Sequence, residues 1–150
     1  MSKYPLLLSA CIVVCCSGSH SKTEIETAMN NYNRHLLHID ADSIALSFEA
    51  NGVLTGEGQK EVKGRDSIRA HLKSFTGATV LSMQSVTQSI EMKGDSAKQQ
   101  GTYIQVVRLS NSDTLELKGD YTANWIAAGK KQWLLQRMYT EHYTNRKLNR

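Results

Sequence analysis

The first regular spacing of hydrophobic residues lies between positions 23 and 39. Its apolar residues recur every three to four positions, the period of one face of an α-helix: Ile25, Ala28, Met29, Tyr32, Leu36 and Ile39. Glu24 and Glu26 fall in the first turn, where carboxylates interact favourably with the helix dipole. Residues 23–39 are therefore predicted to form a long helix with one buried face.

Two shorter helices and a brief strand are predicted next. Residues 40–43 break the first helix, and Asp42 can cap a second one, whose apolar residues are Ile44, Ala45 and Phe48. The Asn51-Gly52 pair indicates a turn, followed by a strand at 53–55. A third helix opens at 63–66, with apolar residues at helical spacing: Ile68, Leu72 and Phe75.

After Gly77 the spacing changes to the alternation of β-strands. Four strands are predicted, at residues 80–92, 96–109, 114–126 and 132–143. The turns between them are short, so neighbouring strands should pair as antiparallel hairpins. Helices followed by a strand meander indicate an α+β fold. We expect a curved antiparallel sheet that wraps the long first helix as a cone and leaves a cavity at its wide end.

The first 18 residues have the features of a signal peptide. Lys3 precedes an apolar run at 5–16, and small polar residues follow. This run is shorter than the roughly 20 residues that a membrane-spanning helix needs; the alternative is a buried segment of the domain. The sequence thus predicts an exported protein that is periplasmic, secreted or lipid-anchored to the cell envelope.

The site of cleavage stays open between three alternatives. Cys11 or Cys16 would be lipidated in a bacterial lipoprotein, whereas ordinary cleavage would follow Gly18. All cysteines of the chain lie in this segment, at positions 11, 15 and 16. The predicted domain at 19–145 therefore contains no cysteine, which excludes disulfides and thiolate chemistry from it.

The formal net charge of +4 comes from the two ends of the chain. Lys3 and three basic residues of the predicted tail at 146–150 account for it, so the domain is neutral. A nucleic-acid-binding domain normally carries a basic face, and we expect no nucleic-acid partner. No spacing of histidines and carboxylates indicates a metal site, and no cofactor is expected.

Four local features, in this order and at this spacing, resemble the SnoaL-like, or NTF2-like, superfamily. They are Tyr32 midway along the first helix, His38-Ile-Asp-Ala-Asp-Ser-Ile-Ala-Leu-Ser-Phe48, Val62-Lys-Gly-Arg-Asp-Ser-Ile68 and Trp133-Leu-Leu-Gln-Arg-Met. The resemblance spans about residues 24–143, and Ile39 stands where the family usually has Gly. It implies the cone-shaped fold, and homodimerisation through the sheet as in many members.

The scaffold carries enzymes, ligand binders and structural modules, so the resemblance leaves the function open. Ketosteroid isomerases on this fold use an aspartate base with a tyrosine and a protonated aspartate as hydrogen-bond donors. Tyr32 matches that tyrosine. The base falls near Gly56, with Thr55 and Glu57 beside it, and the second acid falls near Tyr121. Only one of the three groups is kept, unless Glu57 replaces the base.

Six residues are candidates for binding a ligand: Tyr32, His35, Tyr103, Tyr121, Trp125 and Arg137. His35 lies about 60° from the centre of the helical stripe, so it either reaches the cavity or lies on an exposed flank. The aromatic residues either line the cavity or fill the core. Strand alternation places Arg137 on the face of Trp133 and Leu135. If that face is inward, Arg137 needs an anionic partner, either a ligand or a protein acid such as Glu141.

The favoured function is an exported protein that holds a mostly apolar small molecule in the cone, with Tyr32 and Arg137 as polar anchors. One alternative is a lyase or isomerase that uses Tyr32 with Glu57 or His35; no catalytic residue is assigned. Another is a homodimeric interaction module. Polar residues on one strand face argue against an apolar interface there: Gln84, Gln88, Gln105, Glu116, Lys118 and Asn124.

Overall fold

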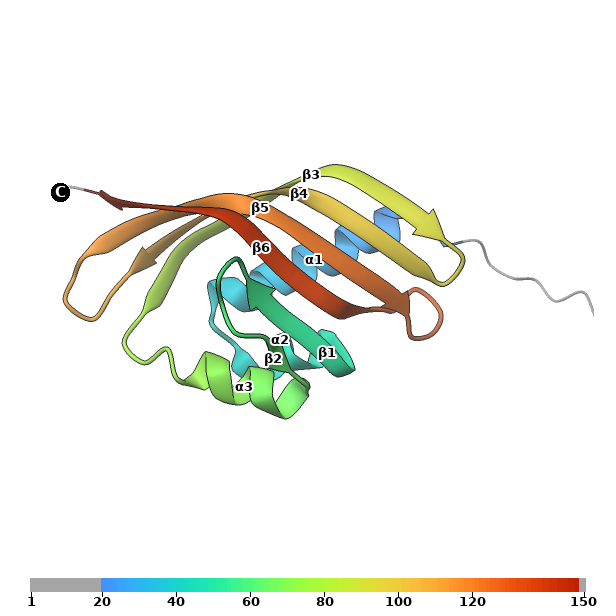
Figure 1. Cartoon of the computed structure of the whole chain (residues 1–150), viewed down its shortest axis with the longest axis horizontal. Coiled ribbons are helices and arrows are strands. Elements are labelled where there is room, and N and C mark those ends of the chain that lie inside the picture. The colour runs from blue at the N-terminus through green and yellow to red at the C-terminus, as the bar shows by residue number, and fades with distance from the viewer. Residues whose placement is uncertain (1–19, 149–150) are drawn as a thin grey trace, which may run out of the picture.

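The computed structural model describes residues 20–148, without the side chains of residues 142 and 143. The predicted signal peptide at 1–18 lies outside these residues, as do the last two residues of the predicted basic tail. The described chain forms α1 (Lys22–Leu37), α2 (Ala41–Leu46), β1 (Phe48–Gly56), β2 (Val62–Lys63), α3 (Arg65–Lys73), β3 (Thr79–Lys93), β4 (Ser96–Arg108), β5 (Thr114–Ala127) and β6 (Trp133–Leu148) (Figure 1). Within this part of the chain, no helix is long and apolar enough to cross a membrane.

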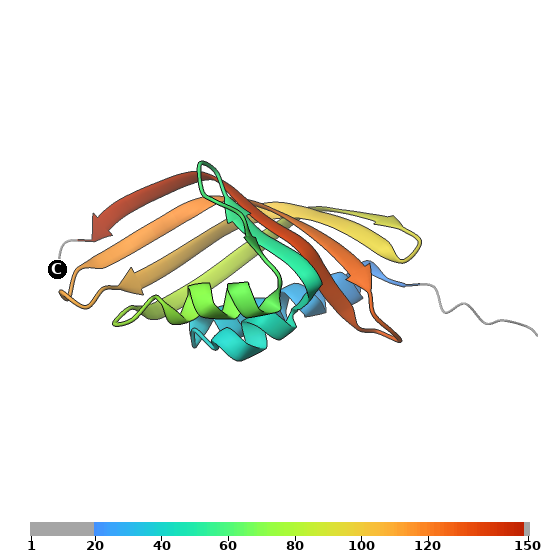
Figure 2. The same ribbon diagram turned by 60° about the horizontal axis from the view of Figure 1, so that its bottom comes forward.

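The six strands form one sheet in the order β2-β1-β6-β5-β4-β3. The hairpins β3–β4, β4–β5 and β5–β6 are antiparallel, as the short turns predict. β1 is longer than the predicted strand and runs parallel to β6, so the sheet is mixed. The three helices lie together on the concave side of the curved sheet, and α1 runs beneath β3 to β5 (Figures 1 and 2). This is the predicted α+β arrangement.

Both ends of α1 have recognisable caps. The Ser21 hydroxyl accepts a hydrogen bond from the Glu24 amide, which satisfies a free donor of the first turn. At the other end, the amides of Ile39 and Asp40 donate to the carbonyls of Leu36 and His35, at 3.0 Å each. This is a Schellman motif, and its left-handed residue is Ile39 with φ 48°. The helix therefore ends two residues before the predicted position.

Several local predictions need correction around α2 and α3. Asp40, and not Asp42, caps α2, because its carboxylate accepts from the Ser43 amide at 3.1 Å; Asp42 instead pairs with Arg69 of α3 at 2.6 Å. Phe48 is fully buried as the first residue of β1, beyond the end of α2. Phe75 lies beyond the end of α3 and is 51% exposed, so it is not part of a buried helical face.

Bulges in the sheet change which residues face the helices. In the β5–β6 pairing, Trp125 is opposite Leu135 and Asn124 is opposite Arg137, so β6 carries one extra residue. A bulge of this kind bends the strand and reverses the alternation beyond it. The inward face accordingly passes from Leu135 to Met138. The prediction that Arg137 shares the face of Trp133 and Leu135 is therefore wrong.

One end of the concave face, next to the β3–β4 and β5–β6 turns, is filled by side chains. We call it the closed end, and its main residues are Ala97, Gln99, Trp125, Trp133 and Leu135. Gln99 is 0% exposed, yet both ends of its amide are paired. Its oxygen accepts from the Trp125 indole at 3.0 Å, and its nitrogen donates to the Thr87 hydroxyl at 2.8 Å. Full pairing makes this buried polar group compatible with the core.

The last strand extends further than the domain boundary predicted at residue 145. β6 continues to Leu148 and pairs with the start of β5. Arg146 forms an ion pair with Glu116 at 3.0 Å, and Lys147 forms one with Asp113 at 2.8 Å. Since Arg146 and Lys147 are exposed, these ion pairs contribute little to stability. Residues 146–148 therefore belong to the sheet.

Candidate functional site

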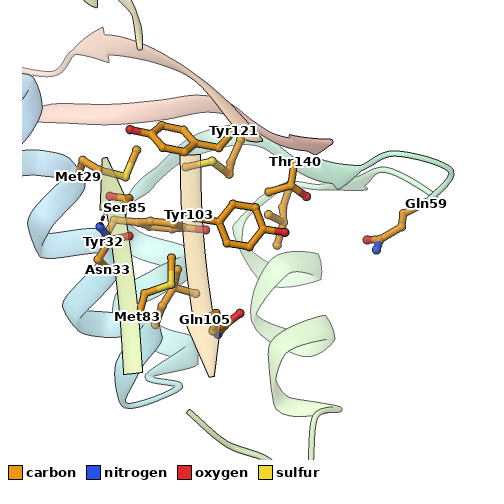
Figure 3. Close-up of a pocket in the computed structure, with 13 residues that line it drawn as sticks. Met29, Tyr32, Asn33, Gln59, Met83, Ser85, Tyr103, Gln105, Tyr121 and Thr140 are labelled. Carbon is orange, nitrogen blue, oxygen red and sulfur yellow. Dashed lines mark hydrogen bonds between the residues drawn. The ribbon is translucent and has the colours of Figure 1, made fainter. Parts of the chain in front are cut away.

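A cavity of about 190 Å³ lies between α1 and the sheet, beyond the closed end (Figure 3). We call this region the cavity end. α1 contributes four of its lining residues: Met29, Tyr32, Asn33 and Leu36. The strands and the loop after β1 contribute the others: Leu54, Gln59, Met83, Ser85, Tyr103, Gln105, Tyr121, Met138 and Thr140. All thirteen of these described side chains lack a formal charge.

Two glycines leave room for two of the tyrosine rings. Tyr121 lies opposite Gly101 across the β4–β5 pair, and Tyr103 lies opposite Gly119. A Cβ at Gly101 would be 2.8 Å from the Tyr121 hydroxyl, and one at Gly119 would be 3.1 Å from the Tyr103 hydroxyl. Each ring therefore lies across the glycine of the neighbouring strand, an arrangement in which the aromatic side chain covers the bare backbone.

A chain of hydrogen bonds crosses the cavity wall from β5 to α1. The Tyr121 hydroxyl lies 3.4 Å from the Thr87 hydroxyl and also hydrogen-bonds to Ser85. We call Ser85, Thr87 and Tyr121 the hydroxyl cluster. On one side, the Thr87 hydroxyl accepts a hydrogen bond from the side-chain amide of Gln99, which belongs to the closed end. On the other side, Asn33 Nδ2 donates to Ser85 Oγ at 2.7 Å.

The second polar atom of the Asn33 amide is not satisfied. Asn33 Oδ1 is enclosed and has no hydrogen-bond partner among the described residues. A buried acceptor without a partner costs about 1–3 kcal/mol, and such atoms are uncommon in folded proteins. Because Asn33 lines the cavity, a ligand with a hydrogen-bond donor would remove this cost once a small shift of the neighbouring side chains uncovers the oxygen.

The tyrosines of the wall are neutral hydrogen-bonding groups. Tyr32 is 4% exposed, and burial raises the pKa of its phenol far above the ordinary value. Its ring packs edge-on against Phe48, with centroids 6.0 Å apart. Burial also raises the pKa of Tyr121, against the opposing effect of its hydrogen bonds with Thr87 and Ser85. Both phenols therefore remain protonated at neutral pH and can donate a hydrogen bond.

The structure brings together three of the six candidate residues from the sequence. Tyr32, Tyr103 and Tyr121 line the same cavity, and Tyr32 extends from α1 toward Tyr103 (Figure 3). Trp125 belongs to the closed end, where its indole is hydrogen-bonded to Gln99. His35 is partly buried on α1 and is not among the lining residues.

Arg137 lies on the outer side of the sheet, 39% exposed, as a result of the β6 bulge. Its guanidinium donates to Glu61 through two nitrogens, at 2.7 and 2.8 Å. The anionic partner is thus a protein acid, although it is Glu61 and not the expected Glu141. Glu57, the candidate replacement for the isomerase base, is exposed beyond the end of β1 and does not line the cavity.

Sequence reasoning missed several residues of the wall. Asn33 follows Tyr32 at the edge of the helical stripe. Asparagine is a weak helix former, so its presence in the interior of a helix indicates a role other than helix stability. Gln105 was expected on the outer polar face, but it shares the parity of Tyr103 and lines the cavity. The repeated Gly-x-Tyr pattern, at 101–103 and 119–121, could have indicated the two rings over glycines.

The described residues contain no group of three or more His, Cys, Asp or Glu side chains that could hold a metal ion. The polar groups of the cavity are phenols, hydroxyls and amides. They can orient a small molecule and donate to or accept from it, and none of them is a carboxylate or an imidazole.

Several solved structures share this architecture at low identity. A ketosteroid isomerase-like protein from Erwinia carotovora atroseptica aligns with 85% of this chain and 96% of its own, at TM-score 0.71 and 16% identity. A proposed scytalone dehydratase from Novosphingobium aromaticivorans aligns with 85% of this chain and 88% of its own, at TM-score 0.70 and 18% identity. A protein from Catenulispora acidiphila in complex with S-DNPA aligns with 80% of this chain and 91% of its own, at TM-score 0.60 and 12% identity. These similarities concern the fold.

No curated protein matches the sequence. Residues 18–143 match the family model of the SnoaL-like domain, which covers nearly all of the described chain. The curved sheet, the helix that it wraps and the cavity between them agree with that match. The chain belongs to the SnoaL-like domain family and has the NTF2-like fold.

Proposed function

We propose that the protein binds an uncharged, mostly apolar small molecule at the cavity end. The observation that carries this proposal is the composition of the wall, in which no described side chain is a carboxylate, a histidine, a lysine or an arginine. A charged ligand would lose its hydration there without gaining an opposite charge. A neutral ligand would lose less and would gain the apolar surface that binding pockets typically offer.

The alternative of a lyase or isomerase requires a positioned base near the substrate. Neither Glu57 nor His35 lines the cavity, and the raised pKa of Tyr32 makes this phenol a donor rather than a base.

The interaction-module alternative would use the outer face of the sheet. There, Val86 is 64% exposed and Ile104 39% exposed, but both lie on strands whose other outward residues are largely polar. The cavity therefore supports ligand binding best.

The proposal is tested by native mass spectrometry of the protein purified from its own host, followed by titration with apolar probes monitored by amide chemical shifts. Met83→Trp would fill the cavity from β3, and Gln84→Trp places the same side chain on the opposite, exposed face. We expect a copurified molecule, or shifts at the cavity residues, to be lost only in Met83→Trp. Equal binding by both variants would place the ligand elsewhere and contradict the proposal.

We further propose that the protein is exported, either free or lipid-anchored. Lys3, the apolar run at 5–16 and the small residues after it support this proposal. The measurement is the intact mass of the protein from membrane and soluble fractions of its host. Loss of residues 1–18, or a lipid on Cys11 or Cys16, is expected. A mass that includes the complete N-terminal segment would contradict export by this route.

A further inference from the structure

The volume of the cavity indicates the size of the part of a ligand that it encloses. Its volume is about 190 Å³. An apolar cavity of about 150 Å³ in a protein core is large enough to bind benzene. The volume here thus matches one six-membered ring with a few additional atoms.

The apolar part of the wall favours an aromatic ring. Three methionines from three different elements line the cavity: Met29, Met83 and Met138. Thioether sulfurs make favourable contacts with aromatic rings, and their flexible side chains adapt to the shape of a ligand. The rings of Tyr32, Tyr103 and Tyr121 add surfaces for edge-to-face contacts (Figure 3).

The polar part of the wall offers one acceptor. Asn33 Nδ2 is already bound to Ser85 Oγ, so Oδ1 is the end of this amide that is left for a ligand. That oxygen is enclosed and has no partner within residues 20–148. A ligand atom that binds there must carry a hydrogen.

The hydroxyl cluster offers one donor. Its three members, Ser85, Thr87 and Tyr121, have three hydroxyl hydrogens, and the two contacts between them use two of these. Whichever way the two bonds run, one hydroxyl hydrogen is left over from the contacts within the cluster. Asn33, Ser85 and Tyr121 all line the cavity, and Asn33 is hydrogen-bonded to Ser85, so a small group in the cavity that lies next to Ser85 is also next to the Asn33 amide. A hydroxyl is such a group, because it donates one hydrogen bond and accepts others.

We propose that the ligand class of this cavity is the uncharged, single-ring phenols. The ring packs between the methionines and tyrosines, and the hydroxyl donates to Asn33 Oδ1 while it accepts from the hydroxyl cluster. This assignment rests on the proposed binding function and makes it more specific.

The test compares five probes of similar size by calorimetric or chemical-shift titration: p-cresol, 4-methylanisole, p-xylene, 4-methylcyclohexanol and 4-methylbenzoate. We expect p-cresol to bind about 5- to 10-fold more tightly than 4-methylanisole, which has no hydrogen to donate. We expect 4-methylcyclohexanol to be weaker than p-cresol because it lacks the aromatic ring. Binding of 4-methylbenzoate should be weakest, because the wall has no opposite charge.

Asn33→Leu should weaken p-cresol binding about 5- to 10-fold and change p-xylene binding less than about twofold. The matched control is Asn30→Leu, on the exposed side of α1, which should change neither. If Asn33→Leu does not fold, Tyr121→Phe provides a second test. It removes one hydroxyl from the cluster and should weaken p-cresol severalfold without affecting p-xylene.

The outcomes separate this inference from the proposed function. Equal affinities for p-cresol, 4-methylanisole and p-xylene at the cavity would overturn the phenol assignment and leave the binding function standing. An alcohol preferred over the phenol would overturn the aromatic part of the assignment. Tight binding of 4-methylbenzoate, or no shift at any cavity residue with any probe and no copurified molecule, would overturn the proposed function as well.

Discussion

The closed end and the cavity end of the concave face are built by the same strands, but they differ in how their buried amide groups are hydrogen-bonded. At the closed end, Gln99 is fully buried and both ends of its amide are bound, to Trp125 and to Thr87. At the cavity end, Asn33 binds Ser85 through its nitrogen and leaves its oxygen without a partner in the described chain. A buried amide that is fully paired holds the core together, whereas a half-paired one remains available to a ligand.

The two ends of α1 also differ, one being held by side-chain hydrogen bonds and the other ending in an unfavourable backbone conformation. At the closed end, the Glu24 carboxylate accepts from the Trp133 indole at 3.1 Å and contacts His20 at the same distance. At the other end, the chain leaves the helix through Ile39, a β-branched residue in the left-handed region. Such a conformation is unusual for this residue type. The closed end is thus anchored, and the end near the cavity carries conformational strain.

The largest effect is expected from Gly101→Ala, which should distort the cavity end. A Cβ at this position would overlap the Val86 carbonyl oxygen, so β3 and β4 would have to separate. We expect a loss of about 3 kcal/mol in the free energy of unfolding, measured by denaturant titration. Gly94→Ala is the control, because its Cβ meets no atom within 4 Å and only its positive φ opposes the change. Similar losses in both variants would show that steric crowding at Gly101 is unimportant.

The second effect concerns the pairing of buried amides. Gln99→Leu leaves the Trp125 indole without its acceptor and should cost about 2 kcal/mol in the free energy of unfolding. Asn33→Leu is the matched change at the cavity end. It removes an unsatisfied oxygen together with one hydrogen bond, so its net effect should stay within about 0.5 kcal/mol. Equal losses from the two substitutions would contradict the contrast between the two ends.

A smaller, stabilising effect is expected from Ile39→Gly at the end of α1. Glycine adopts the left-handed conformation without steric cost, and we expect a gain of about 0.5–1 kcal/mol after the loss of the partly buried side chain. Thermal and denaturant unfolding would measure it. Ile39→Ala removes the side chain but keeps a Cβ at positive φ, so it should destabilise. If glycine and alanine behave alike, the backbone conformation is not the source of strain.

The smallest effect is a dependence of stability on pH that comes from Glu24. The hydrogen bond from Trp133, then that from His20, lowers the pKa of this carboxyl below its ordinary value of 4.5. The unfolded chain therefore binds the proton more readily, so this contribution to stability is complete above pH 4.5 and is lost as the pH falls through the lowered pKa.

The measurement is the free energy of unfolding against pH for wild type, Glu24→Gln and Glu26→Gln. Glu24→Gln should flatten the profile below pH 4.5 relative to wild type. Glu26 lies on the exposed side of the same helix, and its replacement should leave the Glu24 contribution unchanged. His20 also contacts Asp95, so the comparison uses the difference between the wild-type and Glu24→Gln profiles rather than either profile alone. Parallel profiles for wild type and Glu24→Gln would contradict the role of Glu24.

Much of the architecture followed from local patterns. The spacing of Ile25, Met29 and Tyr32 predicted α1, and alternation with short turns predicted the four long strands within a few residues of their observed ends. Of the six candidate residues for a ligand, Tyr32, Tyr103 and Tyr121 line the cavity, whereas His35, Trp125 and Arg137 do not. The helix and strand predictions succeeded because periodic burial and turn length are properties of consecutive residues.

Alternation failed where the sheet is irregular. It placed Arg137 on the same face as Trp133 and Leu135, but one extra residue in β6 puts Arg137 on the outer side, next to Glu61. Residues that are distant in sequence decide where a bulge falls, because the bulge depends on how the paired strands match in length and curvature. The parallel pairing of β1 with β6 is a long-range feature of the same kind.

The sequence by itself determined the helix and strand pattern, the α+β class, the family resemblance and the neutral charge of the domain. The tertiary structure decided the composition of the cavity wall, and with it the roles of Asn33 and the hydroxyl cluster. Whether a polar side chain is satisfied depends on atoms that four separate elements bring together: α1, β3, β4 and β5. No local pattern in a sequence records such a balance of donors and acceptors, because it exists only once the chain has folded.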